Sequence, residues 1–256
     1  MKCQRAIFLK LTNALIFLAL STQIAFAGMT ISGTRIIFPG NEREQTVRTT
    51  NKSNLPLLVQ VWTDDGSKNE DINKMKVPFT VTPPVYRVEP GKGQSIRLIY
   101  NGMTLPQDRE SVFWFNLLEI PPVKETAKET DRLELAFRTR IKIFYRPSQL
   151  KSSSAQEVER LSWEVIDAGK GVKVTNPTPY YFSFDSASLT SGTAKHQLNV
   201  DMVAPFESKI FTLAAKATVG IVNRVDIRLI NDYGSVVEHQ LVYSQGKGLT
   251  LNNHNK

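Results

Sequence analysis

Histidine and cysteine, the side chains that most often hold a metal or act as nucleophiles, are scarce in this sequence. His196, His239 and His254 lie far apart, whereas zinc ligands usually come in pairs a few residues apart. No Gly-x-Ser-x-Gly turn is present, and Gly91-Lys-Gly93 lacks the third glycine of a dinucleotide loop. We therefore predict no catalytic residues, no metal site, no cofactor and no enzymatic activity.

The residue pattern that does suggest a function is an alternation between Leu133 and Arg146. Every second residue from Leu133 to Tyr145 is apolar, apart from Thr139. The positions between them carry most of the charge, on Glu134, Arg138, Arg140, Lys142 and Arg146. This two-residue period is typical of a β-strand with one apolar face, and fourteen residues is long for a strand.

Two interpretations of this segment are open from its pattern alone. In the first, Leu133–Arg146 is a long strand whose apolar face simply contributes to the core. In the second, one end of the strand extends beyond its own domain. An exposed apolar edge attracts other strands and is normally suppressed. In an exported protein, such an edge would be a binding element that adds a strand to a partner.

The elements that must position this strand follow a predicted secretory signal peptide, residues 1–27. Lys2, Arg5 and Lys10 precede the apolar run 14–20, and Ala25-Phe26-Ala27 is a small-x-small cleavage motif. The apolar run is shorter than the about 20 residues that span a bilayer. We expect export with cleavage after Ala27, which also removes Cys3, the only cysteine.

The mature chain, residues 28–256, would contain 229 residues, no cysteine and a net charge of +5, against +8 for the whole chain. Without disulfides or thiolate metal sites, it must be stabilised by the burial of apolar surface. The positive charge is spread thinly along the chain, which argues against a nucleic-acid-binding surface.

Short runs rich in Val, Ile, Phe, Tyr and Thr recur between Gly, Pro and Asn, which predicts an all-β protein. The clearest strands are expected at 34–38, 57–62, 94–100, 112–120, 133–145, 162–166, 172–175, 180–184, 225–230 and 236–243. Only 154–161 suggests a short helix, and its charge pattern fits a loop equally well. The polar run 151–154 places a domain boundary near residue 150. We expect two immunoglobulin-like β-sandwich domains, 28–150 and 151–256, each near the ~100 residues of that fold.

Five segments of the sequence closely resemble the periplasmic pilus-assembly chaperones of the PapD-like family. The most specific is 105–121, Leu-Pro-Gln-Asp-Arg-Glu-Ser-Val-Phe-Trp-Phe-Asn-Leu-Leu-Glu-Ile-Pro. The others, in the family's order, are Thr82–Pro90, Arg140–Pro147, Asn176–Tyr181 and Ile230–Gly234. They occur in both predicted domains, so the resemblance covers nearly the whole mature chain.

The resemblance implies two immunoglobulin-like domains in a boomerang arrangement, acting in the periplasm. Chaperones of this family bind pilin subunits, including the tip adhesin, and deliver them to an outer-membrane usher. A pilin lacks its last strand, and the chaperone completes the pilin fold with its own G1 strand, a process called donor-strand complementation. The implied partners include no nucleic acid and no small-molecule substrate. Self-association through the G1 edge is left open.

The same resemblance assigns the long alternating strand to G1. Leu133, Leu135 and Phe137 align with the side chains that fill pockets in the pilin's groove. The second interpretation of the strand, an end that extends beyond its own domain, is therefore favoured. Phe137 places an aromatic ring where an aliphatic side chain is common, which suggests a roomy pocket in the cognate pilin.

Five charged residues also match functional positions of the family. Arg35 and Lys142 match two basic cleft residues that bind the pilin's C-terminal carboxylate. Glu110, Arg146 and Asp232 match an ion-pair network between the domains. From the residues alone, all five would be interpreted as solvated surface charges, with ~0–1 kcal/mol for each exposed ion pair.

The loop that precedes the donor strand refines the expected subclass. Val123–Arg132 has ten residues and contains no cysteine pair. These features fit the short F1–G1 loop subclass, whose members serve rod-like pili. Thr82-Pro83 is a candidate cis peptide bond, because cis is tolerated mainly before proline.

Two other functions stay open at this point. One is an exported structural or adhesive immunoglobulin-like sandwich, and the other is a chaperone of a non-pilus surface fibre. A fibre subunit would be expected to carry an N-terminal donor extension, and the segment 29–32 lies too close to the expected cleavage site for one. The sequence does not indicate which pilus such a chaperone would serve.

Overall fold

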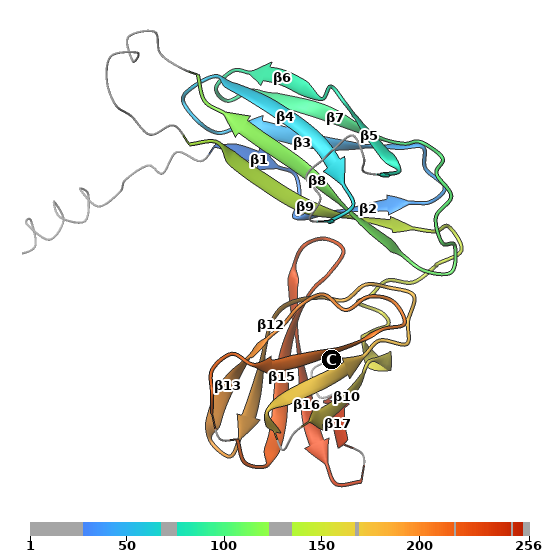
Figure 1. The fold of residues 1–256 in the computed structure, drawn as a ribbon, viewed down its shortest axis with the longest axis vertical. Coiled ribbons are helices and arrows are strands. Elements are labelled where there is room, and N and C mark those ends of the chain that lie inside the picture. The colour runs from blue at the N-terminus through green and yellow to red at the C-terminus, as the bar shows by residue number, and fades with distance from the viewer. Residues whose placement is uncertain are drawn as a thin grey trace, which may run out of the picture.

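The computed structural model describes residues 28–67, 76–122, 135–166, 169–217, 219–246 and 248–252. The predicted signal peptide, Leu133 and the predicted loop Val123–Arg132 lie outside these ranges. The described chain forms two β bodies, an N-terminal sandwich from Met29 to Arg146 and a C-terminal barrel from Ser162 to Leu251 (Figure 1). No helix in the described ranges is long and apolar enough to cross a membrane.

The N-terminal sandwich consists of two sheets. The first has the strand order β1 (Met29–Ile31), β3 (Glu44–Asn51), β7 (Gly93–Tyr100) and β5 (Phe79–Thr82). The second has the order β2 (Arg35–Pro39), β9 (Phe137–Arg146), β8 (Ser111–Ile120), β4 (Leu57–Asp64) and β6 (Val85–Val88). Residues 29–39 therefore contribute one short strand to each sheet.

Alternating residues of the two sheets form one core between them. In the second sheet, Val59, Phe115 and Ile143 have no exposed surface. The rings of Phe38 and Phe79, with centroids 4.9 Å apart, link the second sheet to the first. The C-terminal half of the apolar face of β9 thus lies in the core, which fixes the direction in which its other side chains point.

At its N-terminal end, β9 differs from the expected strand. The strand begins at Phe137 rather than Leu133, and Leu135 precedes it without strand pairing. β9 pairs with β8 in antiparallel register from Phe137 onward, but with β2, in parallel register, only from Lys142 to Arg146. Among the described residues, the edge of 137–141 that faces away from β8 has no partner strand. The strand begins where its pairing with β8 begins, at Phe137 opposite Glu119.

The C-terminal barrel contains eight strands. They follow the closed order β10 (Ser162–Ile166), β11 (Gly171–Thr175), β14 (Ser208–Leu213), β13 (Ala194–Asn199), β12 (Ser183–Ser191), β15 (Val222–Ile230), β16 (Val236–Ser244) and β17 (Gly248–Leu251). Trp163, Phe184 and Phe211 pack edge to face in its core. Of the candidate helix 154–161, only Val158–Arg160 forms a short 3-10 helix.

The two bodies meet along one side of the N-terminal sandwich. Strands β2 and β9 lie on the side that faces the barrel (Figure 1). Across this junction, Arg35 Nη1 donates a hydrogen bond of 3.0 Å to the carbonyl oxygen of Ile230, at the end of β15. The rings of Phe144 on β9 and Tyr181 before β12 pack with centroids 5.7 Å apart. The Thr82–Pro83 bond, away from this junction, is cis.

Candidate functional site

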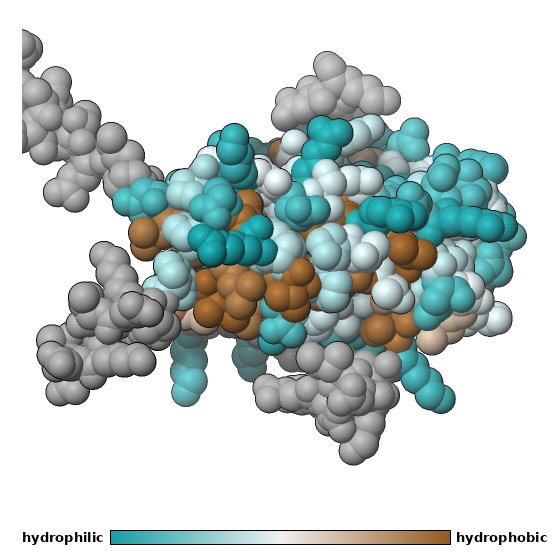
Figure 2. All heavy atoms as spheres, turned by 90° about the horizontal axis from the view of Figure 1, so that it is seen from above, coloured by the Kyte–Doolittle hydropathy of each residue, from teal (hydrophilic) through white to brown (hydrophobic). Residues whose placement is uncertain are grey.

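The N-terminal end of β9 exposes large apolar side chains. Leu135 is 52% exposed and Phe137 is 59% exposed, whereas Ile143 and Tyr145, further along the same alternation, are buried. Seen from above, the N-terminal sandwich shows apolar patches between hydrophilic side chains (Figure 2). The apolar stripe of β9 therefore continues out of the core onto the surface, next to a backbone edge that no described strand pairs. Leu133, the third predicted pocket residue, lies outside the described residues.

Arg35 and Lys142 lie directly opposite each other in the parallel register of β2 and β9. Opposed residues of paired strands point to the same face of the sheet, and here that face is the outer one, toward the barrel. The Arg35 guanidinium lies over the ring of Phe144, 5.7 Å from its centroid. Its Nε is buried and has no hydrogen-bond partner among the described residues. The structure thus brings the two predicted cleft cations together.

The electrostatics of these two cations favour an anionic ligand. Burial lowers the pKa of Lys142, and the neighbouring charge of Arg35 lowers it further, while Asp201 opposes both effects. Burial also lowers the pKa of Arg35, although Asp232 and Glu110 act in the opposite direction. Two half-buried cations that repel each other would be stabilised by a carboxylate placed between them.

Glu110, Arg146 and Asp232 form a connected ion-pair network across the junction. Arg146 Nε donates to Glu110 Oε1 at 2.7 Å, and its Nη1 and Nη2 donate to the two carboxylate oxygens of Asp232 at 2.8 and 3.1 Å. Glu110 is almost fully buried, and its Oε2 accepts the backbone N–H of Tyr181 at 2.8 Å. The network thereby links Arg146, the last residue of β9, and Glu110, the residue before β8, to the β15–β16 turn of the barrel.

The charges in this network stabilise one another despite their burial. Burial raises the pKa of Glu110, and the charge of Arg146 and the Tyr181 N–H counteract that effect only in part, so the pKa stays above its usual value. Burial alone would lower the pKa of Arg146, but the hydrogen bonds to Asp232 and the charge of Glu110 raise it overall. The Tyr181 N–H left no signal in the sequence, because any residue except proline can supply a backbone donor.

We expect Asp232→Asn to loosen the junction without unfolding either body. The substitution removes the charge that Arg146 meets in a bidentate pair, and hydrogen bonds to charged groups contribute about 1.5–3 kcal/mol. The melting temperature should fall modestly, and small-angle scattering should report a changed angle between the bodies. Asp185→Asn is the matched control, because Asp185 pairs with Arg228 on the exposed surface of the barrel. Unchanged melting and scattering of Asp232→Asn would mean that the network does not hold the junction.

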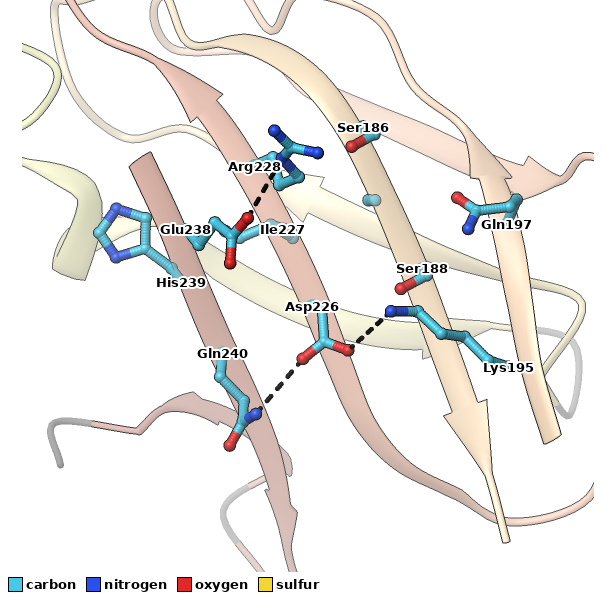
Figure 3. A pocket seen from close by; sticks show the side chains of 11 residues that line it. Ser186, Ser188, Lys195, Gln197, Asp226, Ile227, Arg228, Glu238, His239 and Gln240 are labelled. Carbon is cyan, nitrogen blue, oxygen red and sulfur yellow. Dashed lines mark hydrogen bonds and ion pairs between the residues drawn. The ribbon is translucent and has the colours of Figure 1, made fainter. Parts of the chain in front are cut away.

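A polar groove on the barrel is lined by charged side chains that pair with one another. Asp226 accepts a hydrogen bond from Gln240 at 3.3 Å and lies 3.6 Å from the Lys195 ammonium, while Arg228 lies 3.5 Å from Glu238 (Figure 3). Burial lowers the pKa of His239, at the edge of the groove. These pairs neutralise the groove from within, so its geometry favours no particular ligand.

Both halves of the chain match models of one protein family. Residues 28–151 match the model described as pili and flagellar-assembly chaperone, PapD N-terminal domain. Residues 156–241 match the model for the C-terminal domain of the pili assembly chaperone PapD. The two matches agree with the two β bodies of the structure, and they confirm the predicted fold of two immunoglobulin-like β domains.

Relatives of known name are similar over most of their length. The probable fimbrial chaperone YadV of Escherichia coli K12 is 42% identical over 237 residues, 90% of this chain and 96% of YadV. The chaperone protein HifB of Haemophilus influenzae is 39% identical over 234 residues, 90% of this chain and 94% of HifB.

Solved structures of chaperones have a similar fold. The crystal structure of YadV matches with a TM-score of 0.71 and 42% identity, covering 84% of this chain and 98% of YadV. The Salmonella enterica SafB chaperone, in a complex with the SafA pilin, matches with a TM-score of 0.71 and 26% identity, covering 86% of this chain and 98% of the matched chain.

Proposed function

We propose that this chain, which belongs to the PapD family of pili and flagellar-assembly chaperones, binds pilin subunits and completes their fold with its β9 strand. The observation that carries this proposal is the exposed apolar stripe of Leu135 and Phe137, beside an edge of β9 that has no partner strand in the described parts of the chain. Similarity to the SafB chaperone, solved in a complex with a pilin, supports it over an adhesive sandwich or a chaperone of another surface fibre. The function needs no catalysis.

The strand is donated through backbone and side chains together. The free edge of 137–141 supplies N–H and C=O groups to a pilin strand, and alternate side chains enter the pilin's open core. Burial of one large apolar side chain contributes ~1.5–3 kcal/mol, so Leu133, Leu135 and Phe137 together would contribute roughly 5–9 kcal/mol before ordering costs. A neighbouring subunit's extension can later replace the donated strand.

Arg35 and Lys142 bind the C-terminal carboxylate of the pilin in this proposal. Arginine offers a planar fork of donors and lysine a compact charge, and both suit a carboxylate. Because the carboxylate is held at a defined point of β9, it sets the register in which the pilin strand pairs with the donor strand. The apolar stripe alone could pair in registers two residues apart.

Residues 1–27 form the cleaved signal peptide of the proposed protein, 28–150 its pilin-binding domain and 151–256 its second domain. The mature chaperone acts in the periplasm, receives pilins including the tip adhesin, and passes them to an outer-membrane usher. The loop length 123–132 assigns it to the short-loop subclass.

The direct test is co-expression with candidate pilins encoded nearby, followed by affinity purification of the chaperone from the periplasm. We expect a soluble one-to-one complex with at least one pilin, and degradation or aggregation of that pilin when the chaperone is omitted. Recovery of the chaperone with the outer surface of the cell, and no stabilised pilin, would contradict the proposal and favour an adhesive sandwich.

A further inference from the structure

On the outer face of β9, the sequence pattern indicates solvated charges, but the structure shows a connected cluster. Arg140 Nη2 donates to Asp64 Oδ1, and Arg138 Nη2 lies 3.3 Å from Asp64 Oδ2. Asn116 Nδ2 donates to Asp64 Oδ2 at 2.7 Å, and Asn116 Oδ1 accepts Arg138 Nη2 at 2.7 Å. We call these four residues, Asp64, Asn116, Arg138 and Arg140, the Asp64 network.

The Asp64 network has a buried centre and two stacked arms. The Asp64 side chain is 4% exposed and Asn116 is fully buried. Arg138 lies over the ring of Trp62, 5.0 Å from the centroid, and Arg140 lies over Trp114 at 4.7 Å. A guanidinium that is paired with a carboxylate and stacked on an indole has few free rotamers. Although the Arg138 and Arg140 side chains are 47% and 36% exposed, the buried carboxylate distinguishes this network from an exposed surface ion pair.

The network lies in the part of β9 that is paired on one side only among the described strands. Arg138 and Arg140 lie within 137–141, the part of β9 that β2 does not pair. Their anchors, Asp64 and Asn116, belong to β4 and β8, so the network ties this part of β9 to its neighbour β8 and to β4 beyond it. The strand begins at Phe137, one residue before the first anchored arginine. The anchored face is opposite the face that carries Phe137 and Ile143.

The network also affects the cations that a pilin carboxylate would meet. The outer face of β9 carries Arg138, Arg140, Lys142 and Arg146 at alternate positions. Asp64 compensates the first two, and Glu110 with Asp232 compensates the last. Lys142, beside Arg35, is the cation of this face that forms no ion pair with a carboxylate among the described residues.

From these contacts we propose that Asp64 is a positioning residue for strand donation, a role that rests on the proposed function. It orders the segment 137–141 before a pilin arrives, and it withholds Arg138 and Arg140 from the pilin carboxylate. Preordering lowers the entropic cost of binding. Withholding Arg140 matters because a carboxylate bound there, two residues from Lys142, would shift every pocket side chain along the pilin groove.

The ordering role is tested by hydrogen exchange on the free chaperone, which requires no pilin. In Asp64→Asn, the amides of 137–141 should exchange faster, while those of Ile143–Tyr145, paired on both sides, should keep their wild-type rates. Glu44→Gln is the matched control, because it removes a carboxylate from an arginine pair on the other sheet. Unchanged exchange at 137–141, or equal acceleration throughout the sandwich, overturns the role.

A second variant approaches the network from the donor strand. The double variant Arg138→Gln/Arg140→Gln should show the same faster exchange at 137–141 as Asp64→Asn. The triple variant should exchange little faster than either, because the residues act as a unit. With a pilin that wild type binds, each variant should bind about tenfold more weakly. Absence of binding by wild type would refute the proposed function, while the exchange result would still decide the ordering role.

The effect on the carboxylate is tested in the Lys142→Ala background. If Asp64 withholds Arg140, then Asp64→Asn should partly restore the pilin binding that Lys142→Ala loses, because Arg140 becomes free to bind the carboxylate. Adding Arg140→Gln should remove the recovery. Binding by the double variant that is no stronger than that of Lys142→Ala overturns this part of the proposal.

Discussion

Replacement of either Arg35 or Lys142 by alanine is expected to nearly eliminate the chaperone–pilin complex, while the chaperone stays soluble and folded. The two side chains lie opposite each other on paired strands and repel each other until an anion is bound. Loss of either one leaves the pilin carboxylate poorly compensated in the cleft. Truncating one partner of a buried, hydrogen-bonded charge pair costs ~2–5 kcal/mol, or roughly 30-fold to several-thousandfold in affinity. Isothermal titration calorimetry with a purified pilin measures the affinity of each variant.

Two comparisons separate the carboxylate anchor from a general loss of positive charge. The double variant should bind little more weakly than either single variant, because both residues serve one ligand group. A pilin with an amidated or extended C-terminus should lose far more affinity for wild type than for Arg35→Ala. Near-wild-type affinity of the single variants, or an equal loss with the amidated pilin, would leave the apolar side chains as the whole recognition element.

The pH dependence of binding gives a further measure of the same anchor. Burial and the charge of Arg35 lower the pKa of Lys142 in the free chaperone, whereas a bound carboxylate favours the protonated form. Binding therefore takes up a proton once free Lys142 begins to deprotonate, and affinity declines as the pH rises through its lowered pKa. The decline should begin below about 10.4, the usual lysine value. Lys142→Arg stays protonated and should remove this component, although its planar fork also changes the geometry.

The other large effect is expected for Leu135→Glu, which should abolish pilin binding and leave the free chaperone folded. Leu135 is half exposed and precedes the paired part of β9, so the free protein tolerates a charge there. In the complex the same side chain would enter a dry apolar groove, where an unpaired carboxylate costs several kcal/mol. Circular dichroism and melting of the variant alone, followed by the pilin pull-down, give both parts of the result.

The control for Leu135→Glu is Ile210→Glu. Ile210 is 53% exposed, against 52% for Leu135, but it lies on β14 of the barrel. The same substitution there should leave pilin binding intact. Unfolding of Leu135→Glu on its own would mean that Leu135 belongs to the core, and normal binding by the folded variant would mean that the donor segment lies elsewhere.

Much of the architecture is encoded in local residue patterns. A two-residue alternation of apolar side chains defines a strand with one buried face, whatever its neighbours are, and β4, β7, β8 and β16 lie close to where that alternation predicts them. The alternation is weaker in β3 and β13, so the sequence does not predict these two strands clearly. Their side chains are mainly polar, and their pairing with neighbouring strands stabilises them.

The limits of β9 depended on tertiary structure. Apart from Thr139, the alternation continues to Leu133, but the strand begins at Phe137, because the pairing of β9 with β8 ends there, opposite Glu119. Sequence periodicity shows which side chains share a face. It does not show where a neighbouring strand stops, and that decides which part of the face is exposed.

The charged residues also show which features the sequence predicts and which depend on tertiary structure. Residue types and family resemblance selected Arg35, Lys142, Glu110, Arg146 and Asp232, but the register of β2 on β9 and the docking of the barrel bring them together. Asp64 had no signal at all, since its partners are 52, 74 and 76 residues away along the chain. The sequence by itself determined the strand faces and the kinds of charge they carry. Only the tertiary structure decided which charges are paired and which are left for a ligand, because pairing depends on separations of a few ångströms between distant segments.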